Sequence, residues 1–248
     1  MFGIGDRFNT VVQRLLNLLY PHVCFHCTLP ITGAATALPF CASCWGGVRL
    51  LSGPHCPVCA IPFPSGSALS HSPDHRCGEC RDAPPPFTQA ITPFAYEGAL
   101  AEAIQRFKYR RQTTLALPLA TLLLECLDPV SFDQIAAVPL HPSRLRAREF
   151  NQSLLIARQV ALRLKKPLLI DLMERTRETP PQVGLSKKER DENVRRAFRI
   201  INPAPIQGKR VLLLDDVYTT GATLKEGAKT LLKSGAEAVV VAAVARML

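Results

Sequence analysis

Cysteine is the residue type with the clearest chemical pattern in this chain. Eight of the nine cysteines fall between Cys24 and Cys80, where they form four Cys-x-x-Cys pairs. Two cysteines separated by two residues can turn both sulfurs toward one ion, and two such pairs supply the four thiolates of a tetrahedral structural zinc site. The four pairs therefore predict two zinc ions, with these ligands: Cys24, Cys27, Cys41, Cys44, Cys56, Cys59, Cys77 and Cys80.

The spacing leaves open how the pairs combine. We favour sequential pairing, first with second and third with fourth, because each half then resembles a zinc ribbon; a cross-braced arrangement, first with third, is the alternative. Disulfides are disfavoured in a cytosolic chain, and iron–sulfur ligation usually has a close run of three cysteines. A site closed by four sulfurs has no position for water, so its role is structural or recognitive. Nearby histidines are interpreted as solvated loop residues, and the ninth cysteine as a core residue: His26, His55, His71, His75 and Cys126.

A second stretch whose residues could bind a ligand begins at the apolar segment Val211–Leu214, which we interpret as a buried strand. Two acids, a short loop rich in threonine and a predicted helix over Ala222–Lys233 follow it. The carboxyl ends of parallel strands bind ligands in open sheets, and loop amides with a helix N-terminus suit a phosphate. Two acids beside a phosphate would repel it unless they accept hydrogen bonds from a pair of sugar hydroxyls. In this hypothesis the hydroxyls of Thr219, Thr220 and Thr223 donate hydrogen bonds to the phosphate, and Gly221 lets the backbone close around it.

The elements that must position these residues follow from the apolar patterns. Helical periodicity is present at about 98–109, 113–126 and 151–165, and Asn151 or a residue just before it is the candidate cap of the third helix. Apolar runs at Ile135–Val138 and Ala238–Ala245 read as further buried strands. Helices that alternate with buried strands predict an open, mostly parallel α/β sheet.

The run Ala83–Pro86 is a stiff, polyproline-like joint, and we place a domain boundary there. We expect an amphipathic helix over residues 1–20, a double zinc-ribbon module over 21–86 and the α/β domain over 87–248. The helix would gather Val12, Leu15, Leu16 and Leu19 on one face. The sequence has no segment typical of a membrane span and no good signal peptide, so we expect a cytoplasmic protein.

The formal charge of +10 is concentrated in one segment. Residues 141–200 hold fifteen Lys or Arg and seven Asp or Glu, a net charge of +8. This concentration indicates a polyanionic ligand at one face of the protein.

The run from Asp215 to Thr223 resembles the phosphoribosyl-pyrophosphate (PRPP) binding motif of type I phosphoribosyltransferases, which has two acids, two or three residues, Thr-Gly and a hydroxyl. The resemblance implies these PRPP-binding residues: Asp215, Asp216, Val217, Tyr218, Thr219, Thr220, Gly221, Ala222 and Thr223. Over nearly its whole length, zinc module included, the chain is similar to the ComF family. The further segments that carry this resemblance are Phe107-Lys108-Tyr109, Val138-Pro139-Leu140, Arg144 with Arg148, Phe150-Asn151-Gln152, Thr179 with Gln182, Gly184-Leu185, Arg190, Asn193 and Ala197-Phe198.

This resemblance implies a type I phosphoribosyltransferase-like domain behind a zinc-ribbon module, PRPP with Mg²⁺ as ligand, and a role in DNA uptake or DNA utilisation. By the same analogy, the pyrophosphate and a flap over the site involve Arg144, Arg148, Gln182 and Lys187. The chain departs from the family pattern at Glu149, where the family usually has glycine, and at Arg110-Arg111, where it often has one. If the first glycine serves a positive φ angle, the local turn must differ here.

The basic segment has three interpretations that do not exclude one another: a grip on pyrophosphate, a track for single-stranded nucleic acid with Phe150 or Phe198 stacking on bases, and a solvated helical face. Two functions therefore stay open. One is a PRPP-dependent transferase that joins ribose 5-phosphate to a nitrogen nucleophile. The other is a non-catalytic, PRPP-responsive protein that binds single-stranded DNA or a partner in DNA uptake. The sequence names no acceptor pocket and no catalytic residue.

Overall fold

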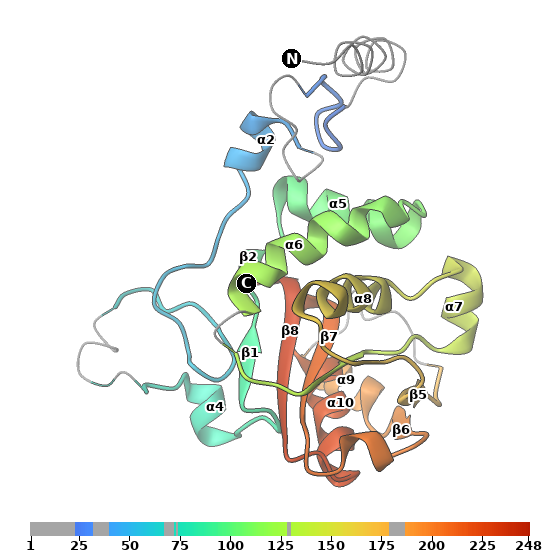
Figure 1. The fold of residues 1–248 in the computed structure, drawn as a ribbon. Coiled ribbons are helices and arrows are strands. Elements are labelled where there is room, and N and C mark those ends of the chain that lie inside the picture. The colour runs from blue at the N-terminus through green and yellow to red at the C-terminus, as the bar shows by residue number, and fades with distance from the viewer. Residues whose placement is uncertain (1–22, 32–39, 67–71, 73, 128–129, 179–186) are drawn as a thin grey trace, which may run out of the picture.

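The computed structural model describes residues 23–31, 40–66, 72, 74–127, 130–178 and 187–248. The expected helix over residues 1–20 lies outside these residues, and so do His71, Thr179 and Gln182. Figure 1 shows the cysteine-rich region as an arm beside and above a layered α/β domain.

A parallel sheet forms the centre of the α/β domain. Its order is β1-β8-β7-β3-β4, and β2 also pairs with β8. Every ladder in this sheet is parallel, which confirms the predicted open α/β sheet. The strands are β1 (Gln89–Ile91), β2 (Phe94–Ala95), β3 (Gln134–Ala137), β4 (Leu168–Leu169), β7 (Arg210–Tyr218) and β8 (Ala238–Arg246).

Helices cover both faces of the sheet because its central strands are apolar on both sides. Leu212 and Leu214 of β7 pack into the core beneath three helices, whereas Val211 and Leu213 pack toward α10 on the other face. Figure 1 shows the three helices above the strands and α10 behind them. The four helices are α5 (Gly98–Tyr109), α6 (Ala116–Leu127, after a 3₁₀ turn at Thr113–Leu115), α8 (Gln152–Leu164) and α10 (Ala222–Lys233).

The helices predicted near 98–109, 113–126, 151–165 and 222–233 are confirmed. Asn151 caps α8, because its side-chain oxygen accepts the backbone N–H groups of Ser153 at 3.1 Å and Leu154 at 3.4 Å. One strand differs from its prediction. β7 does not end at Leu214 but runs on to Tyr218, so the two acids lie within the strand and not in the loop after it. The strand can continue because the acids find polar partners while Val217 and Tyr218 stay paired with β8.

A small hairpin-like unit lies at one end of the domain. β5 (Met173–Arg175) pairs antiparallel with β6 (Phe198–Ile200), and the helix α9 (Lys187–Val194) belongs to the segment between them. The helix α7 (Pro142–Arg148) follows β3, and a short 3₁₀ turn at Ala204–Ile206 precedes β7.

The cysteine-rich region repeats one local structure twice. Two tight turns are each closed by an isolated antiparallel bridge, Val23 with Pro30 and His55 with Pro62. In each turn the residue after the second cysteine has a positive φ, 63° at Thr28 and 58° at Ala60. Each turn is followed by a short helix whose N-cap is a cysteine: α2 (Ala42–Gly46) and α4 (Gly78–Asp82).

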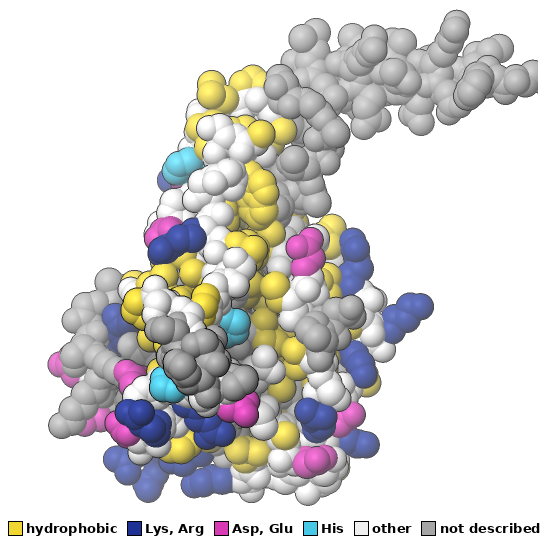
Figure 2. All heavy atoms as spheres, turned by 90° about the vertical axis from the view of Figure 1, so that its left-hand side faces the viewer, with side chains coloured by type: hydrophobic (Ala, Val, Ile, Leu, Met, Phe, Trp, Pro, Cys, Tyr) yellow, Lys and Arg dark blue, Asp and Glu magenta, His cyan; other side chains and the backbone are white. Residues whose placement is uncertain are grey.

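The surface of the arm is largely apolar on one side. Figure 2 shows hydrophobic side chains running down the cysteine-rich region, while Lys and Arg side chains gather at the lower end of the molecule. The exposed large hydrophobic residues of the arm include Val23, Leu29, Leu50 and Ile61. Among the described residues, no helix is both long and apolar enough to cross a bilayer.

Candidate functional site

A cavity of about 680 Å³ opens at the carboxyl ends of β3 and β7. This is the position at which open parallel sheets bind ligands. Its lining comes from α5, α7, α8, β5, α9, β7, the β7–α10 loop and the start of α10. It includes Lys108, Tyr109, Arg144, Arg148, Ser153, Arg175, Arg190, Asp215, Asp216, Val217, Tyr218, Thr219, Gly221 and Thr223.

The two acids of β7 both line the cavity, and each has a polar partner. The Lys108 Nζ lies 2.7 Å from Oδ1 of the buried Asp216. Oδ1 of Asp215 accepts hydrogen bonds from the Ser153 hydroxyl at 2.8 Å and from the Asp216 backbone N–H at 2.9 Å. The protein thus engages one oxygen of each carboxylate. A ligand in the cavity would approach the other oxygen.

The charges of the acid pair are strongly linked to Lys108. Burial raises the pKa of Asp215 to about 7, and the neighbouring charge of Asp216 adds to the rise, while Lys108 and Ser153 oppose it. For Lys108, burial would lower the pKa, but the charges of Asp216 and Asp215 outweigh burial and raise it. Lys108 is therefore a permanent cation that neutralises Asp216, and Asp215 titrates near neutral pH.

The loop after β7 divides its hydroxyl residues between two tasks. Thr219 and Thr223 line the cavity. Thr220 is not part of the lining, and its hydroxyl accepts a hydrogen bond from the backbone N–H of Ala222 at 3.4 Å, in the first turn of α10. Gly221 has a φ of 78°, and a Cβ there would lie 2.2 Å from the Tyr218 hydroxyl oxygen. Glycine is thus required at this position both by backbone conformation and by space.

Four arginines also line the cavity: Arg144 and Arg148 from α7, Arg175 from β5 and Arg190 from α9. Burial, and next the charge of Arg144, lower the pKa of Arg175 to about 10. Burial and the charge of Arg148 likewise lower the pKa of Arg144. Arg144 therefore repels Arg148 and Arg175, while Asp215 attracts Arg175, and an anion beside Arg144 would relieve the repulsion.

Arg148 is held by the end of α5. It donates hydrogen bonds to Gln152 Oε1 at 3.2 Å and to the Tyr109 hydroxyl at 3.3 Å, and its guanidinium lies 4.9 Å from the Tyr109 ring centroid. The neighbouring residue Glu149 corrects one expectation. It adopts a φ of 68° itself, so the turn keeps the conformation that a glycine would favour. It also forms an ion pair at 2.8 Å with Arg111, the other position where the chain departs from the family pattern.

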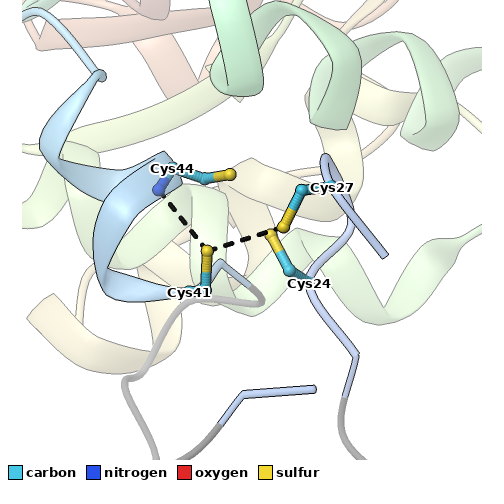
Figure 3. Close-up of side chains that lie close together, drawn as sticks. All are labelled: Cys24, Cys27, Cys41 and Cys44. Atoms are coloured by element: carbon cyan, nitrogen blue, oxygen red, sulfur yellow. Dashed lines mark hydrogen bonds between the residues drawn. The ribbon is translucent and has the colours of Figure 1, made fainter. Parts of the chain in front are cut away.

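The eight cysteines form two clusters. The first cluster is Cys24, Cys27, Cys41 and Cys44, and the second cluster is Cys56, Cys59, Cys77 and Cys80; within each, all four sulfurs lie within 4.8 Å of one another. This is the sequential arrangement, so the cross-braced alternative is wrong. Figure 3 shows the four sulfurs of the first cluster turned toward a common centre.

The geometry of the clusters suits zinc. The Sγ atoms of Cys27 and Cys41 are 3.6 Å apart, and so are those of Cys59 and Cys77. Four sulfurs at about 2.3 Å from a tetrahedral zinc ion are about 3.8 Å from one another. Backbone N–H groups of Cys44 and Cys77 point at cysteine sulfurs in their clusters, at 3.5 and 3.4 Å, as suits thiolates. In the described residues no histidine belongs to either cluster.

Comparison with known proteins now identifies the family. The DNA utilization protein YhgH of Escherichia coli K12 is 34% identical over 238 residues, which covers 93% of this chain and 100% of that protein. Competence protein F of Haemophilus influenzae is 34% identical over 231 residues, covering 90% of this chain and 96% of that protein. The chain belongs to the ComF family.

The domain matches agree with the two parts of this ComF protein. Residues 15–84 match the double zinc ribbon domain, and residues 151–247 match the phosphoribosyl transferase domain. Competence protein ComFC of Streptococcus pneumoniae is 31% identical over 146 residues, covering 58% of this chain and 62% of that protein. Among solved structures, the purine phosphoribosyltransferase of Pyrococcus horikoshii has a TM-score of 0.33 and 19% identity, covering 52% of this chain and 71% of that one. A phosphoribosyl transferase domain implies a ligand of the PRPP type.

The structure brings together most of the predicted site residues of this ComF protein. From the predicted PRPP run, all but Thr220 and Ala222 line the cavity, and so do Arg144 and Arg148. Gln182 lies outside the described residues, and Lys187 begins α9 without a described side chain. The sequence did not single out roles for Lys108, Ser153, Arg175 or Arg190. Lys108 and Ser153 lie at the ends of predicted helices, and Arg175 and Arg190 lie in the arginine-rich segment, so the sequence does not distinguish any of them from its neighbours.

Proposed function

We propose that this protein binds PRPP with Mg²⁺ in the cavity at the end of β7. One observation supports the proposal above all: two carboxylates and four arginines line a single cavity. A simple polyphosphate would be repelled by the acids. A ligand with a sugar diol between a phosphate and a pyrophosphate has the charges and donors to satisfy both sides.

In this pose each group of PRPP has a partner of matching chemistry. Asp215 and Asp216 would accept hydrogen bonds from the two ribose hydroxyls, and such charge-assisted bonds are worth about 1.5–3 kcal/mol each. The backbone amides of the loop and the hydroxyls of Thr219 and Thr223 would hold the 5′-phosphate at the start of α10. The arginines would hold the pyrophosphate, since guanidinium groups bind two oxygens at once. Mg²⁺ would enter with PRPP, coordinated mainly by its phosphate oxygens.

We further propose that the protein is a pentosyl transferase. The bond between C1′ and the pyrophosphate oxygen would break, a bond from C1′ to a nitrogen nucleophile would form, and pyrophosphate would leave with its electron pair. The match to the phosphoribosyl transferase domain supports this reaction class. Measurement of pyrophosphate release from PRPP with candidate bases and nucleic acids tests it. Tight PRPP binding without release would favour the non-catalytic, PRPP-responsive alternative.

A second candidate function is binding of single-stranded DNA at the mouth of the same cavity. Tyr109 is 65% exposed and is stacked by Arg148, and Arg110 and Arg111 are exposed beside it. An exposed aromatic ring among cations suits a base and its phosphates. The names of the relatives support a role in DNA uptake or utilisation, and we place the protein in the cytoplasm, where thiols stay reduced.

Titration calorimetry tests the central proposal. We expect wild type to bind Mg²⁺–PRPP at sub-millimolar concentration, and ribose 5-phosphate and pyrophosphate each more weakly, because each occupies one side of the cavity. Absence of PRPP binding at millimolar concentration would contradict the proposal. Elemental analysis of the same samples should give close to two zinc ions per chain, and less than about half an ion after reconstitution would exclude zinc sites in both clusters.

A further inference from the structure

Arg246, the last residue of β8, is a buried cation beside the second cluster. It is 4% exposed. Its Nη1 donates to the carbonyl oxygen of Cys59 at 2.6 Å and lies 3.5 Å from the Thr92 hydroxyl oxygen, while its Nε has no hydrogen-bond partner in the described part of the chain. A buried guanidinium is costly unless an opposite charge is near. Four thiolates around one Zn²⁺ carry a formal charge of about −2, so the loaded second cluster supplies it.

The other face of Arg246 touches the cavity. Its guanidinium carbon lies 4.8 Å from the ring centroid of Tyr218, which is its neighbour across the β7–β8 ladder. The Tyr218 ring is buried and lines the cavity, and its hydroxyl lies directly against Gly221. A continuous line of contacts therefore runs from the backbone of a cluster cysteine, through Arg246 and Tyr218, to the glycine of the loop.

The first cluster has no comparable connection among the described residues. It packs with Phe40 and Trp45 against Ala99 and Ala103, in the first half of α5. Its nearest polar link to the domain is His26, whose Nδ1 lies 2.7 Å from Glu102. These contacts are at the end of α5 away from Lys108.

We propose that Arg246 is a positioning residue through which the second cluster, and not the first, holds the phosphate-binding loop in shape. This inference rests on the proposed PRPP site. Tyr218 is the direct support of Gly221, and Arg246 fixes the Tyr218 ring by stacking on it from behind. Arg246 itself is fixed by the Cys59 carbonyl, whose place depends on the metal that closes the second cluster. Loss of that metal, or of Arg246, would loosen the loop without touching the arginine side of the cavity.

Arg246→Met is the sharpest variant because it keeps all eight cysteines and replaces only the guanidinium end of an unbranched side chain. We expect it to weaken PRPP and ribose 5-phosphate binding at least tenfold in calorimetry, with pyrophosphate affinity within threefold of wild type and two zinc ions retained. A merely structural role would weaken all three ligands in proportion. Tyr218→Phe, which keeps the ring and removes the hydroxyl against Gly221, should weaken PRPP about threefold or more.

Cys77→Ser and Cys41→Ser form a matched pair, since each cysteine is the N-cap of a five-residue helix. We expect Cys77→Ser to lower PRPP affinity at least tenfold and Cys41→Ser to lower it less than threefold. The inference is overturned if Arg246→Met binds PRPP within threefold of wild type, or if the two serine variants behave alike. If Arg246→Met does not fold, unchanged PRPP affinity in Tyr218→Phe overturns it. Failure of wild type to bind PRPP would instead contradict the proposed function.

Discussion

The two sides of the cavity are built in different ways. The acid side, Asp215 and Asp216 with residues 219–223, comes from one continuous run of β7, its loop and α10. The basic side comes from three separate elements, α7, β5 and α9, which contribute Arg144, Arg148, Arg175 and Arg190. A continuous run is shaped by its own backbone, whereas a side assembled from distant segments is shaped by the packing of the whole domain. The two sides should therefore respond differently to substitution.

The largest effect is expected on the acid side, from Gly221→Val. A β-branched residue is strained at a φ of 78°, and its Cβ would collide with the Tyr218 hydroxyl. We expect loss of PRPP binding by more than about a hundredfold in calorimetry, at unchanged zinc content. Gly208→Val is the matched control, because Gly208 has a φ of 62° but open space around it, away from the cavity. Equal losses in both variants would show that backbone strain alone, and not the loop, explains the result.

Arg175→Met tests the basic side. Loss of a charge-assisted contact to pyrophosphate corresponds to roughly ten- to a hundredfold weaker binding of PRPP and of pyrophosphate. Ribose 5-phosphate affinity should not change. Arg199→Met, on the paired strand β6 but exposed, is the control and should bind PRPP normally. An unchanged pyrophosphate affinity in Arg175→Met would remove Arg175 from the site.

The difference in pH dependence of PRPP binding between wild type and Asp215→Asn reports on the acid side. In the proposed pose Asp215 must be an ionised carboxylate to accept a charge-assisted hydrogen bond from a ribose hydroxyl. Burial raises its pKa to about 7. Its ionised fraction therefore rises from about a tenth at pH 6 to about nine-tenths at pH 8. PRPP affinity should rise several-fold over that interval. Asp215→Asn should bind more weakly and retain only the slope that comes from ionisation of the ligand; identical slopes in the two proteins would contradict this assignment.

The smallest effect is expected at the rim, beyond the basic side. Glu149→Gly removes an ion pair whose partners are both more than half exposed, worth about 0–1 kcal/mol, and relieves a left-handed backbone conformation at a non-glycine residue. Denaturant unfolding should shift by no more than about 1 kcal/mol, and PRPP affinity should stay within twofold. A tenfold loss of PRPP affinity would extend the basic side to Glu149 and Arg111.

The same difference explains what could be predicted from the sequence. The acid side was predictable because strand, acids, loop glycine and helix follow one another in the chain. Lys108 was not, because its pairing with Asp216 depends on how α5 packs beside the sheet. Arg175 was not predictable either, because many arginines of its segment look alike in sequence. Only its burial and the contact of its guanidinium with the Phe198 ring distinguish it. The eight cysteines of the two clusters could be predicted from the Cys-x-x-Cys spacing. The local spacing also favoured their sequential pairing.

Titration of Mg²⁺–PRPP into wild type and into the double variant Asp215→Asn, Asp216→Asn tests the central claim most directly. The acids are expected to bind the ribose hydroxyls, so PRPP binding should weaken by roughly ten- to a thousandfold. This is less than the loss of two whole charge-assisted bonds, because each asparagine oxygen still accepts a neutral hydrogen bond. Pyrophosphate should bind the double variant at least as well as wild type, because two like charges near it are gone. A double variant that binds PRPP as tightly as wild type, or a wild type that does not bind PRPP at all, would contradict the account.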